Sequence, residues 1–246
     1  MTGLETLAAA ATTGAAHPVL TYYDDATGER TDLTADALAG WAGRVARLLH
    51  EGCGLTTGDR AAVLLPPHWQ TAAVLLGAWA ANVSVSFRLA ATAGLAAVGP
   101  NEDEPFEAVF AACDRIDDWL DHVPTARHRF ALFNDGDVPD GYRDLLVALE
   151  PYGGTLPGYA TLRASDAASV DGTTYREWGG LARVLAEQHG WHPGDRVLVD
   201  AAAHEHAVFW LLAPFAAGVS VVLCANLDRG RLDERIAAEC VTQVFA

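Results

Sequence analysis

An internal repeat constrains the fold of this chain more than any other feature of its sequence. Residues 58–85 return as residues 194–221 at a constant offset of 136 positions, without a gap. The identical positions include two tripeptides and a histidine: Gly58-Asp59-Arg60 with Gly194-Asp195-Arg196, Val83-Ser84-Val85 with Val219-Ser220-Val221, and His68 with His204. Alanine and valine are abundant here and can match by chance, but Gly-Asp-Arg, His and Ser cannot be explained by composition. The sequence therefore predicts a duplicated helix–strand–helix–strand unit.

Each copy of this unit alternates strands with helices. Strands are expected over 61–65, 83–87, 196–199 and 219–223, and helices over 34–49, 68–81, 175–188 and 204–217. A β-prone pair of segments around a turn predicts a hairpin over 19–33. Strands alternating with helices form parallel sheets with helices on their faces. We therefore expect an α/β fold of two repeated lobes with largely parallel sheets covered by helices, plus a small antiparallel N-terminal hairpin.

The domain boundary is expected in the Pro- and Gly-rich segment 151–158, which is the most linker-like stretch of the chain. It divides a first lobe, residues 1–158, from a second lobe, residues 159–246. The second lobe is expected to close with a helix over 231–239 and a strand over 241–245.

Composition excludes several classes of function. The formal net charge is -16 and the sequence pI about 4.7, which argues against nucleic acid or an anionic membrane as a partner. All 16 basic residues are arginine, so no lysine can form a Schiff base or bind a phosphate. No apolar run is long enough to span a membrane, and no export signal or C-x-x-C pair occurs. A cytoplasmic protein with reduced thiols and no metal site is expected.

Three segments, in this order, resemble the N-terminal domain of the acyl-CoA synthetase and AMP-binding (adenylate-forming) superfamily. Residues 18–22 resemble its opening strand. Residues 58–66 read Gly-Asp-Arg-Ala-Ala-Val-Leu-Leu-Pro and are similar to its recurrent Gly-Asp-Arg-Val-Ala-Val-Leu-Leu-Pro. Two stretches of the third segment, residues 193–198 and 212–218, resemble the segment after its phosphate loop. The chain length is similar to that of a small actinobacterial family of short relatives. The resemblance covers most of the chain except about residues 90–160.

The phosphate loop is where this sequence departs from the superfamily. That loop is rich in Ser, Thr and Gly and ends in Gly-x-Pro-Lys-Gly, so that N–H groups, hydroxyls and a lysine hold phosphate oxygens. The candidate remnant consists of residues from one segment: Ser169, Gly172, Thr173 and Thr174. Asp171 would repel phosphate, and the second glycine, the proline and the lysine are absent. The alternative interpretation is that Thr173 or Thr174 caps the helix expected at 175–188.

The resemblance also implies that the adenine-binding segment, the ribose-binding aspartate and the C-terminal lysine domain of these enzymes come after position 246. We therefore expect a truncated relative that stops before the catalytic motifs, with no catalytic residue and no cofactor.

Two histidines, His204 and His206, follow the second Gly-Asp-Arg. His204 lies within one residue of a position that, by the resemblance, contributes to the acyl pocket, which makes it the candidate remnant of that pocket. The alternative is a histidine at a helix start, since His68 repeats it. His204 and His206 would point about 200° apart on a helix, so they are not expected to share a metal ion. Asp59 and Asp195 are expected to bind N–H groups of a turn.

These observations predict a non-catalytic interaction or scaffold module. A small-molecule (acyl or nucleotide) binder or residual enzyme, using a cleft near residues 169–174 and His204, remains the alternative. A hydrolase with histidine chemistry is a third, although no G-x-S-x-G elbow occurs. The expected strand 241–245 has little charge nearby, so a homo-oligomer or protein partner is expected at the C-terminal edge. A monomer that has repacked this edge is the alternative.

Overall fold

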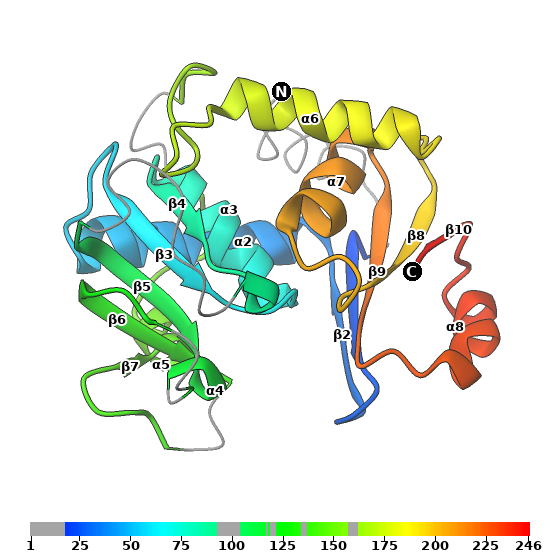
Figure 1. Cartoon of the computed structure of the whole chain (residues 1–246), viewed down its shortest axis with the longest axis horizontal. Coiled ribbons are helices and arrows are strands. Elements are labelled where there is room, and N and C mark those ends of the chain that lie inside the picture. Colours follow the sequence, from blue (N-terminus) through cyan, green and yellow to red (C-terminus); the bar gives the residue numbers. More distant parts are fainter. Residues whose placement is uncertain (1–17, 93–103, 117, 119–121, 134–136, 157–161) are drawn as a thin grey trace. The chain divides into compact units, whose positions relative to one another are not determined.

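The computed structural model describes residues 18–92, 104–116, 118, 122–133, 137–156 and 162–246 (Figure 1). The chain groups into two compact units that are discontinuous in sequence. Unit 1 contains residues 1–39, 67–72 and 176–246, and unit 2 contains residues 40–66 and 73–175. The predicted lobe boundary between residues 158 and 159 lies outside the described residues and stays a prediction.

Unit 1 is built on a five-stranded sheet with the order β10-β8-β9-β1-β2. Only β1 and β2 are antiparallel, and they form the expected hairpin. The strands are β1 (Leu20–Asp24), β2 (Glu29–Leu33), β8 (Arg196–Asp200), β9 (Ser220–Ala225) and β10 (Gln243–Phe245). Helix α6 (Tyr175–Gln188) precedes β8, η3 (Val208–Leu212) and α7 (Ala213–Ala217) join β8 to β9, and η4 (Arg229–Arg231) and α8 (Leu232–Ala238) join β9 to β10. The N-terminal hairpin thus completes the sheet of the second repeat.

Unit 2 is built on a five-stranded, entirely parallel sheet with the order β4-β3-β5-β6-β7. The strands are β3 (Arg60–Leu64), β4 (Ser84–Phe87), β5 (Phe106–Ala112), β6 (Ala126–Leu132) and β7 (Arg143–Asp144). The remaining helices of the described residues are α2 (Ala35–Arg47), η1 (Leu48–Gly52), α3 (Trp69–Ala80), η2 (Ala90–Thr92), α4 (Cys113–Ile116) and α5 (Leu145–Leu149). The central strands are buried on both faces, so they read as continuous apolar runs. The predicted α/β fold class is confirmed.

The register of the parallel strands repeats with the sequence. Arg60 on β3 is opposite Ser84 on β4, and Arg196 on β8 is opposite Ser220 on β9. Both pairs keep the offset of 136 residues found in the sequence, so the predicted duplication is confirmed.

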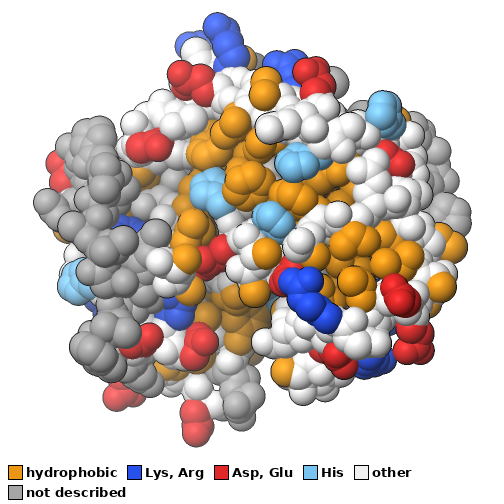
Figure 2. Space-filling view, turned by 45° about the vertical axis from the view of Figure 1, so that its right-hand side comes forward, with side chains coloured by type: hydrophobic (Ala, Val, Ile, Leu, Met, Phe, Trp, Pro, Cys, Tyr) orange, Lys and Arg blue, Asp and Glu red, His pale blue; other side chains and the backbone are white. Residues whose placement is uncertain are grey.

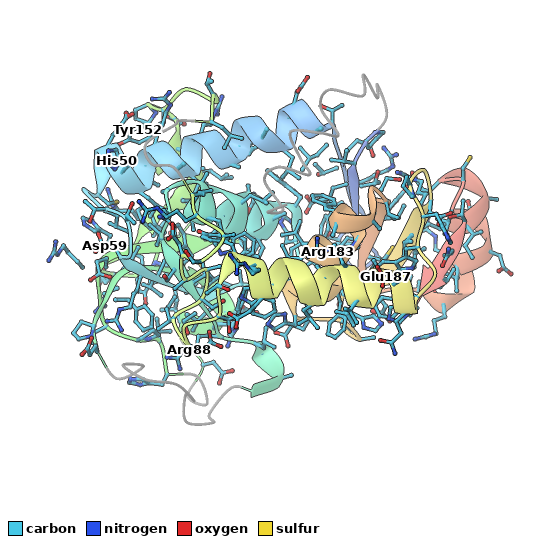
Figure 3. The ribbon with its side chains drawn as sticks, turned by 90° about the horizontal axis from the view of Figure 1, so that it is seen from above. His50, Asp59, Arg88, Tyr152, Arg183 and Glu187 are labelled. Atoms are coloured by element: carbon cyan, nitrogen blue, oxygen red, sulfur yellow. The ribbon has the colours of Figure 1, made fainter. Side chains whose placement is uncertain are left out.

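The Gly-Asp turn in front of each strand pair is also built in the same way. The Thr56 N–H donates to the Asp59 carboxylate at 2.6 Å, and the His192 N–H donates to the Asp195 carboxylate at 2.8 Å. The glycine before each aspartate has a φ of 91° or 94°, a conformation that a side chain would strain. Asp59, labelled in Figure 3, and Asp195 therefore have the structural role that was predicted.

The second repeat departs from the first where its helix begins. In the first repeat the ring Nδ1 of His68 accepts a hydrogen bond at 3.1 Å from the N–H of Gln70, the second residue of α3. In the second repeat the equivalent bond, at 3.2 Å, runs from the Val208 N–H to the ring of His206. The prediction that this helix starts at His204 was wrong, because residues 204–206 are not helical and helical structure begins at Ala207, directly before η3.

The segment expected to be a linker is packed against α2 within unit 2. The Cα of Gly40 would lie 3.2 Å from a Cβ built on Gly154, and a Cβ built on Gly43 would lie 2.8 Å from the carbonyl of Thr155. Tyr152 lies beside η1, which contains His50 (Figure 3). This close backbone approach requires glycine on α2 and explains why glycines occur in both segments.

A matched pair of glycine substitutions tests this packing. Gly43→Ala should destabilise the protein by about 1–3 kcal/mol, because the new methyl group overlaps backbone atoms that cannot rotate away. Gly40→Ala on the same helix meets no atom nearer than 3.6 Å and should be neutral or stabilising by up to about 1 kcal/mol. Urea unfolding followed by circular dichroism measures both values. Equal effects of the two substitutions would contradict the proposed close approach.

The buried carboxylate of Glu239, the residue after α8, is hydrogen-bonded to side chains of the unit 1 sheet. Glu239 accepts hydrogen bonds from the Tyr23 hydroxyl at 2.5 Å, from Arg30 at 2.9 Å and from Arg196 at 2.7 Å. Its side chain is only 9% exposed. Burial alone would raise the pKa of Glu239, but the bonds from Tyr23, Arg196 and Arg30 outweigh burial and lower that pKa to about 2.

This carboxylate should make stability depend on pH in the acid range. The folded-state pKa of Glu239 is below its ordinary value. Its contribution to the free energy of unfolding is therefore complete at pH values above the ordinary pKa and is lost as the pH falls toward about 2. Glu239→Gln should lower the free energy of unfolding at neutral pH by at most about 3 kcal/mol and flatten its acid dependence. Unfolding curves at neutral and acid pH measure this. An equally steep acid dependence in the variant would show that other carboxylates dominate.

Candidate functional site

The residues of the predicted phosphate-loop remnant lie together on one tight loop of unit 2. Ser169 forms an isolated parallel bridge with Val85 of β4, and Ala167 forms an antiparallel bridge with Thr174. The indole N–H of Trp79 donates to the Ala168 carbonyl at 3.0 Å and further fixes the loop to the unit. The loop is therefore an extension of the β4 edge with its own turn at the tip.

Most amide groups of residues 168–173 donate to acceptors within the protein. The Ala168 and Ser169 N–H groups donate to the Thr173 carbonyl at 2.9 and 3.1 Å. The Val170 N–H donates to the Val85 carbonyl at 3.1 Å, and the Gly172 N–H donates back to the Ser169 carbonyl at 3.0 Å. A loop that cradles phosphate instead directs such groups at the ligand.

The side chain of Asp171 places a carboxylate within the loop. Its carboxylate accepts the Thr173 N–H at 2.9 Å, in the way that Asp commonly closes a turn. The next residue, Gly172, has a φ of 92°, which explains the glycine at this position. The carboxylate therefore accepts an N–H group that would otherwise be free to donate to a phosphate, and it adds negative charge to the loop. Whether Thr173 or Thr174 caps α6 stays a prediction.

His204, the candidate acyl-pocket residue, lies in unit 1 after the carboxyl end of β8. Its N–H donates to the Asp200 carbonyl at 3.1 Å. Its ring stacks on Phe245 of β10, with ring centres 3.6 Å apart and planes 12° from parallel. Burial lowers the pKa of His204, the Asp200 carboxylate opposes that shift and His189 adds to it. One face of the imidazole is thus covered by the protein's own side chain.

His204 belongs to an aromatic cluster that sequence reasoning missed. We define the aromatic cluster as His189, Trp191, His204, Phe209 and Phe245. Phe245 is its centre: it contacts the rings of the other members at centroid distances between 3.6 and 6.2 Å. The members come from four separate segments, which are brought together because β10 pairs with β8. Figure 2 shows one face of the molecule on which histidine side chains lie among hydrophobic ones.

The neighbouring His206 does not share the surroundings of His204. Its ring stacks on Trp178 of α6 at 5.3 Å and accepts the hydrogen bond from Val208 described above. Within the part of the chain that the structure describes, no group of three or more His, Cys, Asp or Glu side chains is placed to hold a metal ion. In the same residues, no helix combines the length and apolar character needed to cross a membrane.

Comparison with solved structures identifies the class of fold. The N-terminal domain of FACL13 from Mycobacterium tuberculosis matches with a TM-score of 0.74 and 17% identity over 100% of this chain. A Mycobacterium tuberculosis fatty acyl CoA synthetase matches with a TM-score of 0.71 and 18% identity, and acetoacetyl-CoA synthetase from Streptomyces lividans with 0.73 and 17%. The chain spans 62%, 48% and 42% of these proteins, respectively. Its fold is that of the N-terminal domain of acyl-CoA synthetases, which confirms the resemblance noted in the sequence.

A sequence relative places the chain more narrowly. It is 32% identical over 239 residues to a TIGR03089 family protein of Mycobacterium tuberculosis, covering 93% of this chain and 91% of that protein. The chain belongs to the TIGR03089 family. No protein-family model matches it.

The loop geometry makes a prediction about nucleotide binding. Asp171→Ser replaces the carboxylate with a hydroxyl of the kind found in phosphate loops. We expect no gain in binding of Mg-ATP or pyrophosphate, because carbonyl groups of the protein still hold the loop amides. Isothermal titration of the variant and the unaltered protein measures this. Binding by the variant alone would show that the charge of Asp171 is the sole obstacle.

Proposed function

We propose that this chain is a non-catalytic protein with an acyl-CoA synthetase-like fold that serves as an interaction or scaffold module. The observation that carries the proposal is the closed loop of unit 2, in which protein acceptors hold the amides of residues 168, 169, 170, 172 and 173. Adenylation requires a site that stabilises the triphosphate and the charge developing on it. A loop that has closed on itself around Asp171 does not supply that site.

Two further observations support the absence of adenylation. The sequence contains no lysine, so no ammonium group can neutralise a phosphate or the developing charge. His204, the candidate acyl-pocket residue by the resemblance, is stacked on Phe245. Both elements of a remnant site are thus engaged in the protein's own packing.

The aromatic cluster favours a second candidate, a small-molecule binder without ligase activity. Two of its rings, His204 and Phe209, are half-buried and follow the carboxyl end of the parallel strand β8, an edge at which α/β proteins commonly bind ligands. An acyl chain or a nucleotide base that displaces Phe245 from His204 would suit such an environment, because both ligands bury apolar or aromatic surface.

We expect no pyrophosphate release when the protein is incubated with ATP, magnesium ions and a broad panel of carboxylic acids. An active acyl-CoA synthetase treated in parallel is the positive control. Release that depends on an added acid and exceeds the no-enzyme rate would overturn the non-catalytic assignment.

Thermal unfolding with acyl-CoAs, AMP and fatty acids separates the two candidates. A binder gives a melting temperature that rises with ligand concentration, since a ligand bound only to the folded state stabilises it. Phe245→Ala is the matched variant, because it should change that rise if the aromatic cluster is the site. The interaction module gives no dose-dependent rise with any of these compounds.

A further inference from the structure

The two edges of the unit 1 sheet differ in how they are protected against pairing. At the β2 edge, Glu29, Arg30 and Asp32 are charged, and Arg30 forms ion pairs with Asp32 at 2.6 Å and with Glu239 at 2.9 Å. Charged side chains at an edge discourage the addition of another strand. The opposite edge, β10, reads Gln-Val-Phe and contains no charge, proline or glycine. Within the described residues, β10 is hydrogen-bonded to β8 on one side and is the last strand of the sheet.

The pairing of β10 with β8 determines which of its backbone groups face outward. The Thr242 N–H donates to the Arg196 carbonyl at 2.8 Å, toward β8. Because successive residues of a strand direct their N–H and C=O groups to opposite sides, Val244 also faces β8. Gln243 and Phe245 therefore present their backbone donors and acceptors to the open edge.

The side chains of β10 divide between the two faces of the sheet. Val244 is aligned with Leu198 of β8, a core residue on the α8 face, yet Val244 remains 45% exposed. Phe245 packs into the aromatic cluster, and the Gln243 amide donates to the Gly190 carbonyl at 3.3 Å. The exposed apolar side chain thus lies at the middle of a neutral three-residue strand.

We propose that a second copy of this chain pairs with β10 in an antiparallel, two-fold symmetric arrangement centred on Val244. Gln243 of each copy is then opposite Phe245 of the other, and each of these pairs exchanges both backbone hydrogen bonds. The two Val244 residues form the non-hydrogen-bonded pair on the axis, where side chains approach most closely. A two-fold axis makes one patch its own partner, and an uncharged strand with a central apolar residue is self-complementary.

A second copy fits this edge better than a charged peptide, because β10 reads Gln-Val-Phe and has no side chain that could pair with a charge. The formal net charge of -16 on each chain opposes association at long range, so the contact has to form at a neutral surface. Salt screens this repulsion beyond about 8 Å at physiological ionic strength. Dimerisation by this route therefore strengthens as salt is added, whereas capture of a basic peptide by an acidic protein weakens.

The inference rests on the proposed role as an interaction module and names its partner. Sedimentation of the full chain over the micromolar range, at low and high salt, should show a monomer–dimer equilibrium that shifts toward dimer with salt. Val244→Lys should weaken the dimer by at least about tenfold without lowering the melting temperature, because like charges would meet on the axis. Val184→Lys, at an exposed position on α6, makes the same change of charge and should leave the dimer intact.

Mixing two variants tests the position of the axis. Chains carrying Val244→Lys and chains carrying Val244→Glu should each be monomeric, and their mixture should form a heterodimer because opposite charges then meet. A monomer at all concentrations, a dimer unaffected by Val244→Lys, or no heterodimer on mixing would overturn the proposal. A monomer that also releases no pyrophosphate would leave the non-catalytic assignment intact, whereas acid-dependent release would remove that assignment irrespective of the oligomeric state.

Discussion

Parallel pairing of two strands behind a Gly-Asp turn underlies both sheets of this protein. In each repeat a glycine with positive φ lets the chain reverse, and the following aspartate accepts an N–H three residues earlier. That turn sets the point at which β3 and β8 begin. The backbone carbonyls of Asp59 and Asp195 then accept the N–H groups of Ser84 and Ser220, which sets the register of the neighbouring strand. Because register determines which side chains reach the core, one local motif fixes much of the packing in each unit.

The chemistry of the phosphate-loop segment follows from how its polar groups are satisfied. A backbone amide that donates to a carbonyl of its own protein has little to gain by turning to a ligand. In this chain the Thr173 carbonyl, the Val85 carbonyl and the Asp171 carboxylate accept such amides. Under the proposed non-catalytic function, this chain keeps the fold of a ligase domain while the loop serves as a structural turn. Fold and function can separate in this way because the fold depends on strand pairing, whereas the chemistry depends on a few unsatisfied donors.

Two neighbouring residues of β10, at the end of the described chain, have different surroundings. Phe245 fills one face of the sheet by stacking on His204, while its neighbour Val244 leaves an apolar side chain in solvent on the other face. The hairpin at the opposite edge carries charged side chains and ion pairs instead. Within the described residues, the edge strand β2 thus carries charged side chains and the edge strand β10 carries none.

The sequence by itself determined the duplication, the strand and helix order of each repeat and the α/β class, because these depend on local periodicity and on a turn motif that recurs at a fixed offset. It also predicted that the segment of Ser169 and Thr173 is the candidate remnant of a phosphate loop. Only the tertiary structure decided that the hairpin around Tyr22 joins β9, that Gly43 packs against residue 155, and that His204 stacks on Phe245. Those contacts join residues far apart in the chain, so their geometry depends on sheet order and close packing, which no local pattern of residues encodes.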